Sequence, residues 1–267
     1  MPPFGGTRCV DHGVKVPALA RWVVGLSLAS ATFATAEPVA VRFRETPENR
    51  TLVLRSLDGK TLAKGAVTVT VRDGRATSQV VFHFTDGSVH DETTEFSQND
   101  VFRLLSYRLV QKGPAFRSAL VTTLDAQTGR AIVRHSEGSG AEEVEEETLA
   151  LSSDVANGMM VPMLKNLGPK TVSATASWVA VTPKPRLVKL AISNAGAAAS
   201  TSSASTGRVI HYVVKAEIGG LSGLLAPLVG KQPPDTHVWI LEGAAPAFAK
   251  SEGPLYLGGP IWRIEVP

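Results

Sequence analysis

Apolar and polar residues alternate over much of the chain after residue 49, which is the pattern of strands that bury one face. Residues 67–71 (VTVTV) show this alternation most clearly. Three Asp-Gly pairs, at 58–59, 73–74 and 86–87, separate the first strand-like segments, and Asp-Gly favours a two-residue hairpin turn. The pattern predicts strands over residues 50–57, 60–72, 75–85, 88–96, 101–112, 115–124, 130–136, 143–151, 171–182, 186–193, 208–218, 236–242, 254–257 and 260–266.

Two segments interrupt the strand pattern. Residues 154–167 place apolar side chains four apart, as an amphipathic helix does, although Asn157-Gly158 also suits a hairpin turn. Residues 219–230 (GGLSGLLAPLVG) are apolar and uncharged, which favours a short helix or an apolar flap. So many strands exceed one flat sheet. We therefore predict a mostly β protein: a large curved antiparallel sheet or unclosed half-barrel, with one or two short helices as a lid.

The N-terminal 36 residues have the features of a signal peptide. Basic residues precede an uncharged stretch from Trp22, and Ala34-Thr35-Ala36 provides the small side chains of a cleavage site. We predict cleavage after Ala36 and export, most simply to the periplasm; an uncleaved N-terminal anchor is the alternative. Residues 37–267 are then one antiparallel β domain, with residues 195–207 (AGAAASTSSASTG) as a flexible loop.

Composition narrows the range of functions. The single cysteine, Cys9, lies in the predicted signal peptide, so the exported domain would have no disulfide or thiolate metal site. A net charge of +3 over 267 residues argues against nucleic-acid binding. No apolar run reaches the ~18–20 residues that span a bilayer. Oligomeric state is left open.

Two segments resemble the periplasmic lipoprotein carriers LolA and LolB and exported bacterial families with the same architecture. They are residues 107–113 (YRLVQKG) and 151–158 (LSSDVANG), taken with the order of the strands. The resemblance implies an unclosed β-barrel that wraps an apolar cavity closed by helices, and it implies binding of a lipid or acyl chain. It assigns no individual site residue.

A metal site is one candidate for chemistry. If Asp86-Gly87 is a two-residue turn, His83 lies opposite His90. Glu92 then shares their face, and two imidazoles with a carboxylate could bind zinc or another divalent metal. The simpler interpretation is a solvated face of the sheet. Without further ligands, the metal-dependent hydrolase is the less favoured hypothesis.

An apolar binding site is the favoured candidate. Methionine side chains adapt to varied apolar shapes, so the two interrupting segments could line a cavity. The predicted ligand-binding residues are Met159, Met160, Met163, Leu164, Leu224, Leu225 and Leu228. The alternatives are ordinary core packing and an envelope interaction protein that docks its apolar flap on a membrane or partner. No nucleophile elbow, zinc-helix motif or phosphate-binding loop occurs, so we predict a non-enzymatic binder without a cofactor.

Overall fold

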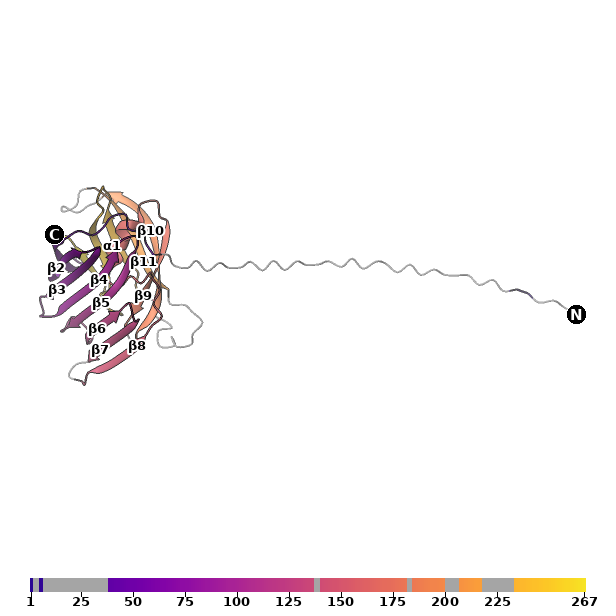
Figure 1. Cartoon of the computed structure of the whole chain (residues 1–267), viewed down its shortest axis with the longest axis horizontal. Coiled ribbons are helices and arrows are strands. Elements are labelled where there is room, and N and C mark those ends of the chain that lie inside the picture. The colour runs from indigo at the N-terminus through magenta and orange to yellow at the C-terminus, as the bar shows by residue number, and fades with distance from the viewer. Residues whose placement is uncertain (2–4, 7–37, 137–139, 182–183, 200–206, 218–232) are drawn as a thin grey trace. The chain divides into compact units, whose positions relative to one another are not determined.

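The computed structural model describes residues 1, 5–6, 38–136, 140–181, 184–199, 207–217 and 233–267. These residues form fourteen strands and one helix, all within the unit Thr35–Pro267 (Figure 1). The first strands are β1 (Glu48–Ser56), β2 (Thr61–Arg72), β3 (Arg75–Phe84), β4 (Val89–Gln98), β5 (Phe102–Lys112), β6 (Ala119–Asp125), β7 (Arg130–Ser136) and β8 (Glu143–Thr148). Then follow α1 (Met160–Leu167), β9 (Ser173–Ala180), β10 (Arg186–Ala199), β11 (Arg208–Glu217), β12 (Thr236–Leu241), β13 (Ala247–Gly253) and β14 (Trp262–Glu265).

The strands make one antiparallel sheet in the order β8-β7-β6-β5-β4-β3-β2-β1-β14-β13-β12-β11-β10-β9. Pairing of β1 with β14 joins the two ends of the β domain, so the open edges are β8 and β9. The predicted fold class, mostly β with an unclosed curved antiparallel sheet, is confirmed.

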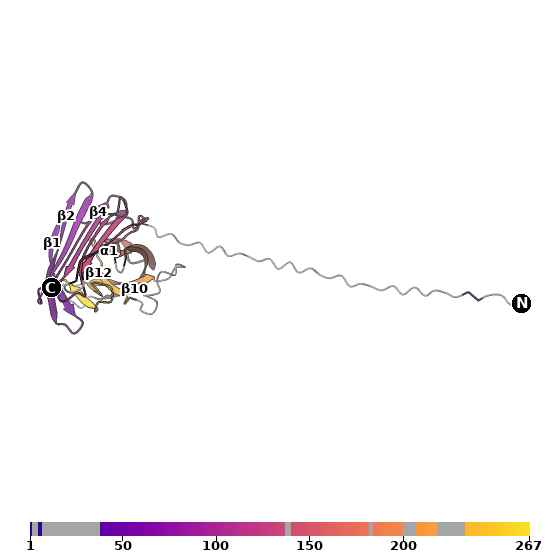
Figure 2. The ribbon, with the colours of Figure 1, turned by 90° about the horizontal axis from the view of Figure 1, so that it is seen from below.

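The sheet curves around α1. Figure 2 shows the helix between strands β1–β4 and strands β10–β12, and we call the face toward α1 the inner face. The main apolar cluster joins α1 to inner-face residues of both halves of the sheet, including Phe96, Leu124, Ile192 and Ile240. The helix therefore occupies the concave side as part of the core.

Residues between β8 and β9 cover the edge of β9. Ala156 N donates to Ser177 O at 2.8 Å and Ser177 N donates to Asp154 O at 3.1 Å, around a short parallel bridge between Val155 and Ser177. An ion pair of 3.5 Å between Lys184 Nζ and Glu145 Oε2 links the β9–β10 turn to β8. The sheet thus remains open at a seam that the connecting segment spans.

The helix is shorter than predicted. Asp154 to Ala156 pair with β9, and Gly158 follows with a positive φ of 66°, so helical structure starts only at Met160. Gly158 also lies against Thr94, whose Oγ1 would be 1.7 Å from an added Cβ. The prediction of one helix over 154–167 is therefore wrong in its first half.

Two strand predictions in the second half also need correction. Part of the predicted loop 195–207 is strand, because β10 continues to Ala199 and pairs with β11 beyond an irregularity between Asn194 and Ala197. The penultimate strand is Ala247–Gly253 and not 254–257, which lies in the turn before β14. Gly and Ala in both regions conceal the alternation that marks a strand.

The segment Pro38–Glu45, which we call the N-terminal strap, crosses to α1 before β1 begins. Asn166 Oδ1 accepts from Arg42 N at 2.7 Å and from Phe43 N at 2.6 Å. Lys165 Nζ pairs with both carboxylate oxygens of Glu45, at 2.8 and 3.0 Å. The strap is therefore fixed by two neighbouring polar residues of the helix.

Two predicted segments lie outside the described residues: most of the predicted signal peptide, and the apolar segment 219–230. Cleavage after Ala36, export and the apolar flap stay predictions. Among the residues that are described, no helix has the length and hydropathy needed to cross a membrane.

Candidate functional site

Four polar side chains meet on the inner face of β4 and β5. We call His90, Glu92, Tyr107 and Gln111 the inner polar cluster. On β4, His90, Glu92 and Thr94 alternate with outward residues, and on β5, Tyr107 and Gln111 alternate with outward Arg108. The register places His90 opposite Gln111 and Thr94 opposite Tyr107. The antiparallel pairing thus brings polar groups of two strands together inside the sheet.

Glu92 and Tyr107 form a buried hydrogen bond. Tyr107 Oη donates to Glu92 Oε1 at 2.9 Å, diagonally across β4 and β5. Burial raises the pKa of Glu92 above its usual range, while the bond from Tyr107 acts in the opposite direction. Burial also raises the pKa of Tyr107, and the Glu92 carboxylate adds to the effect. Tyr107 therefore remains a neutral donor beside a carboxyl group that favours its protonated form.

His90 is held neutral. Its ring is 4% exposed, and burial lowers its pKa to about 4. Gln111 Nε2 lies 3.1 Å from His90 Nδ1 and donates its other hydrogen to Leu255 O at 2.9 Å. Because the amide nitrogen is a donor, Nδ1 accepts and the imidazole proton is on Nε2. His90 therefore presents an N–H group on the inner face.

Apolar side chains lie on both sides of the cluster. Toward α1 is the main core; toward the opposite end is an aromatic cluster that includes Phe82, Phe84, Phe116 and Trp262. Phe116 is at its centre, with ring centroids 5.4 Å from Phe84 and 5.7 Å from Tyr256. The inner face is thus polar in the middle and apolar at both ends.

Val67 and Val80 lie between the two apolar clusters and are only partly buried. Val67 packs against both clusters and Val80 against the aromatic one. The register places Val80 beside Val67 on one side and beside Glu92 on the other. This row leaves apolar surface incompletely covered next to the inner polar cluster.

The predicted apolar site residues have two outcomes. Met159, Met163 and Leu164 are core residues with 2% exposure or less, and Met160 packs partly buried against the same core. Leu224, Leu225 and Leu228 lie outside the described residues. Three of the predicted ligand contacts are therefore occupied in core packing, and the leucines of the segment stay predictions.

The predicted metal arrangement is not found. Phe84 N bonds Ser88 O at 2.9 Å, which makes the loop three residues long, and Asp86 Oδ1 supports it by accepting from Ser88 N. Such a loop shifts the register by one, so His83 lies opposite Val89 and points outward, while His90 lies opposite Phe82. Within the described part of the chain, no group of three or more His, Cys, Asp or Glu residues could hold a metal ion.

Tyr107 and Gln111 are the site residues that sequence reasoning missed. They occur in the segment YRLVQKG, where Tyr107, Leu109 and Gln111 alternate with Arg108, Val110 and Lys112. The apolar member of the first set and the charged members of the second indicate which set points inward. This signal was present, but without the register it did not connect Gln111 with His90 or Tyr107 with Glu92.

A second cluster lies on the outer face. His211 stacks on Trp239 with centroids 4.4 Å apart, and its Nε2 lies 2.9 Å from His237 Nδ1. Lys250 Nζ lies 4.0 Å above the Trp239 ring. Burial and the neighbouring His237 and Lys250 lower the pKa of His211. Stacking and a shared proton between two rings explain this arrangement as cross-strand pairing.

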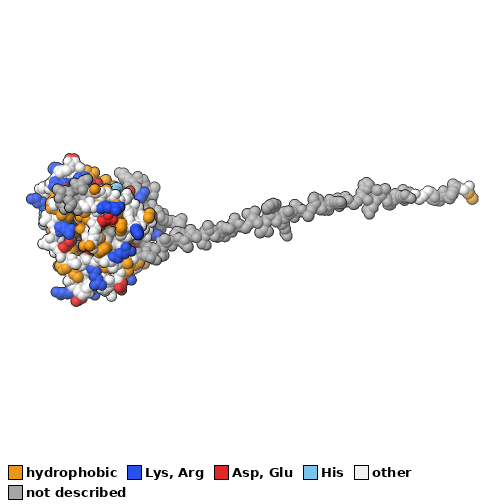
Figure 3. Space-filling model, turned by 90° about the horizontal axis from the view of Figure 1, so that it is seen from above, with side chains coloured by type: hydrophobic (Ala, Val, Ile, Leu, Met, Phe, Trp, Pro, Cys, Tyr) orange, Lys and Arg blue, Asp and Glu red, His pale blue; other side chains and the backbone are white. Residues whose placement is uncertain are grey.

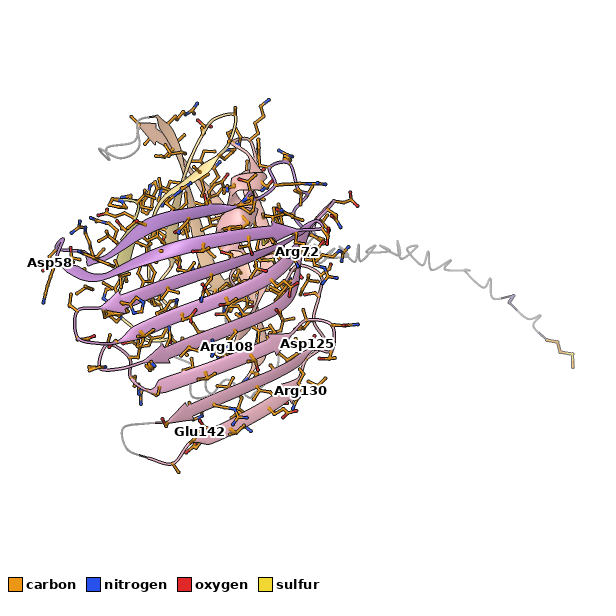
Figure 4. All side chains as sticks on the ribbon, turned by 60° about the vertical axis from the view of Figure 1, so that its left-hand side comes forward. Asp58, Arg72, Arg108, Asp125, Arg130 and Glu142 are labelled. Carbon is orange, nitrogen blue, oxygen red and sulfur yellow. The ribbon has the colours of Figure 1, made fainter. Side chains whose placement is uncertain are left out.

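The outer face is otherwise a mixed surface. Figure 4 shows the strands from the turn at Asp58 to Arg130 and Glu142 as one continuous sheet, with Arg108 on its outer side. On the face in Figure 3, basic and acidic side chains are interspersed with apolar ones. Ion pairs such as Arg130 with Glu146, at 2.7 Å, link neighbouring strands. Such exposed pairs contribute little individually.

These observations define a β-barrel-like protein: an unclosed antiparallel sheet with a helix on its inner face. No protein-family model matches the chain, and neither does any curated protein. Among solved structures, it is similar to a β-barrel-like protein of the domain of unknown function DUF1849 from Brucella abortus. The TM-score is 0.47 at 10% identity, over 84% of this chain and 96% of that chain.

Proposed function

We propose that this protein is an exported, non-enzymatic binder or carrier of an apolar ligand, a lipid or an acyl chain. The ligand lies on the inner face beside the inner polar cluster. One observation carries the proposal: the row Val67–Val80–Glu92 leaves apolar surface partly exposed next to buried polar groups, between two packed apolar clusters. Binding sites for small apolar molecules combine these two features.

The resemblance to LolA and LolB supports the same function, since those carriers hold acyl chains in an unclosed barrel. The site proposed here differs from the predicted one, because Met159, Met163 and Leu164 already pack in the core. Burying a methylene contributes about 0.8 kcal/mol, so a ten-carbon chain supplies about 8 kcal/mol before ordering costs. Micromolar affinity is therefore the expected scale.

The test blocks the inner face with a bulky side chain. Val80→Trp should weaken binding of 1-decanol, measured by isothermal titration calorimetry, by about tenfold or more, because the indole fills the partly exposed surface. Gln79→Trp is the matched control: it puts the same side chain on the exposed outer face of β3, and binding should not change.

Native mass spectrometry of mildly purified protein should also show a retained lipid. Val67→Phe repeats the block if Val80→Trp does not fold, as judged by thermal unfolding. Equal binding by the blocked and control variants would overturn the proposed site. Wild-type protein that retains no lipid and binds no decanol would overturn the function itself.

A further inference from the structure

Glu92 is a carboxyl group inside the protein with a single hydrogen-bond partner in the described part of the chain, Tyr107. That partner contacts Oε1. In the same part of the chain, no cation pairs with Glu92. Buried carboxylates are ordinarily paired with a cation or held by several donors. Glu92 has neither arrangement.

The other charges on the inner side are already matched. Arg50 points inward from β1 but lies three strands from Glu92 in the register, ~14 Å at the usual strand spacing. It pairs with Glu48 at 2.9 Å. Lys165 of α1 pairs with Glu45 of the strap at 2.8 Å. Neither cation is available to Glu92.

His90 does not supply the charge either, although it occupies the next inward position of β4. Its Nδ1 accepts from Gln111, and the surrounding aromatic rings of Phe82 and Phe116 favour the neutral imidazole. The inner polar cluster thus contains one ionisable carboxyl group with a neutral phenol and a neutral imidazole beside it. Its unmatched property is an acceptor for positive charge.

We propose that the ligand is a cationic amphiphile, an alkyl chain with a primary ammonium group, whose head pairs with Glu92 while the chain covers Val67 and Val80. This inference rests on the proposed function and names its ligand class. The ammonium supplies the charge that the carboxylate lacks, and its remaining hydrogens can reach the Tyr107 oxygen. The high pKa of the empty carboxyl group agrees with a site that becomes charged only when a cation enters.

Three probes with the same chain separate head-group preference from apolar burial. They are decylammonium, 1-decanol and decanoate, titrated into wild-type protein at neutral pH by calorimetry. Decylammonium should bind about tenfold or more tightly than decanol, and decanoate most weakly, because a charged hydrogen bond is strong in a dry site and a second anion is repelled.

Glu92→Gln should abolish the preference for decylammonium and leave decanol binding unchanged. Glu95→Gln is the matched control on the same strand: Glu95 points outward toward Arg75, and the preference should persist. The inference is overturned if wild-type protein binds decanoate as tightly as decylammonium, or if Glu92→Gln retains the preference. If none of the three probes binds, the proposed function fails instead.

Discussion

Asn157 pairs with both backbone groups of Val179 at the open edge of β9. Its Nδ2 donates to Val179 O at 3.0 Å, and Val179 N donates to its Oδ1 at 2.8 Å. The side-chain amide therefore replaces the peptide group of a neighbouring strand. All of these atoms are buried, so the edge of β9 here is closed to a further strand.

Asn157→Ala should destabilise the protein by about 2–4 kcal/mol, because it leaves a buried N–H and a buried C=O without partners. Urea unfolding followed by circular dichroism measures the change. Asn49→Ala is the control, since Asn49 is exposed on β1, and its cost should stay within about 0.5 kcal/mol. Equal losses for the two variants would show that water replaces the Asn157 amide.

Gly158 has two reasons to be glycine, and a paired experiment separates them. Its φ is positive, and an added Cβ would meet Thr94 Oγ1. Gly87 also has a positive φ, of 85°, but has open space around it. Gly87→Ala should cost about 1 kcal/mol for the backbone alone, and Gly158→Ala at least twice as much. Similar midpoints in urea would contradict the close packing of Gly158 on β4.

The strands of the first half could be predicted from the sequence because each combines alternation with a turn signal. Arg72 and Arg75 pair across Asp73-Gly74, where both turn residues have positive φ, as a two-residue turn requires. The β3–β4 loop has the same Asp-Gly pair but is one residue longer. Asp86 accepts from Ser88 N there, and that choice of turn is not visible in the dipeptide.

The candidate site was predicted only in part for the same reason. His90 and Glu92 share the inner face, as period-2 alternation requires, but the one-residue register shift separates them from His83. Pairing of β1 with β14 and the position of α1 inside the curve depend on contacts between distant segments. No local pattern encodes those contacts, so the main core and the strap required the structure.

His90 should make stability depend on pH. Burial lowers its folded-state pKa to about 4 from 6.5, so the unfolded chain binds the proton first as pH falls. Stability from this group is complete above pH 6.5 and is lost between 6.5 and 4, up to about 3 kcal/mol. The raised pKa of Glu92 acts oppositely: its contribution is present at low pH and is lost as pH rises.

Comparing variants isolates the His90 contribution, because Glu92 is common to all of them. The free energy of unfolding of His90→Gln, measured in urea at pH 4.5, 5.5 and 6.5, should fall less steeply with acid than that of wild type. His83→Gln removes a histidine from the exposed outer face of β3 and should keep the wild-type slope. A steep slope in His90→Gln would place the titrating group elsewhere.

Lys165 and Glu45 hold the N-terminal strap on α1, and removing one partner should release it. Their side chains are 15% and 7% exposed, so Lys165→Met leaves a buried carboxylate without its cation, at a cost of about 3 kcal/mol. Trypsin cleavage after Arg42 and Arg44 should then be faster than in wild type. Lys184→Met breaks an exposed ion pair instead and should cost less than about 1 kcal/mol.

The double variant Lys165→Met, Glu45→Gln decides whether the unpaired charge or the lost contact matters. Glutamine keeps the shape of Glu45 without its charge, so the double variant should be more stable than Lys165→Met alone. The strap should also regain protection from trypsin, because Asn166 and Gln98 still bind its backbone. A double variant as unstable as the single one would mean that Lys165 fixes the strap by packing and not by charge.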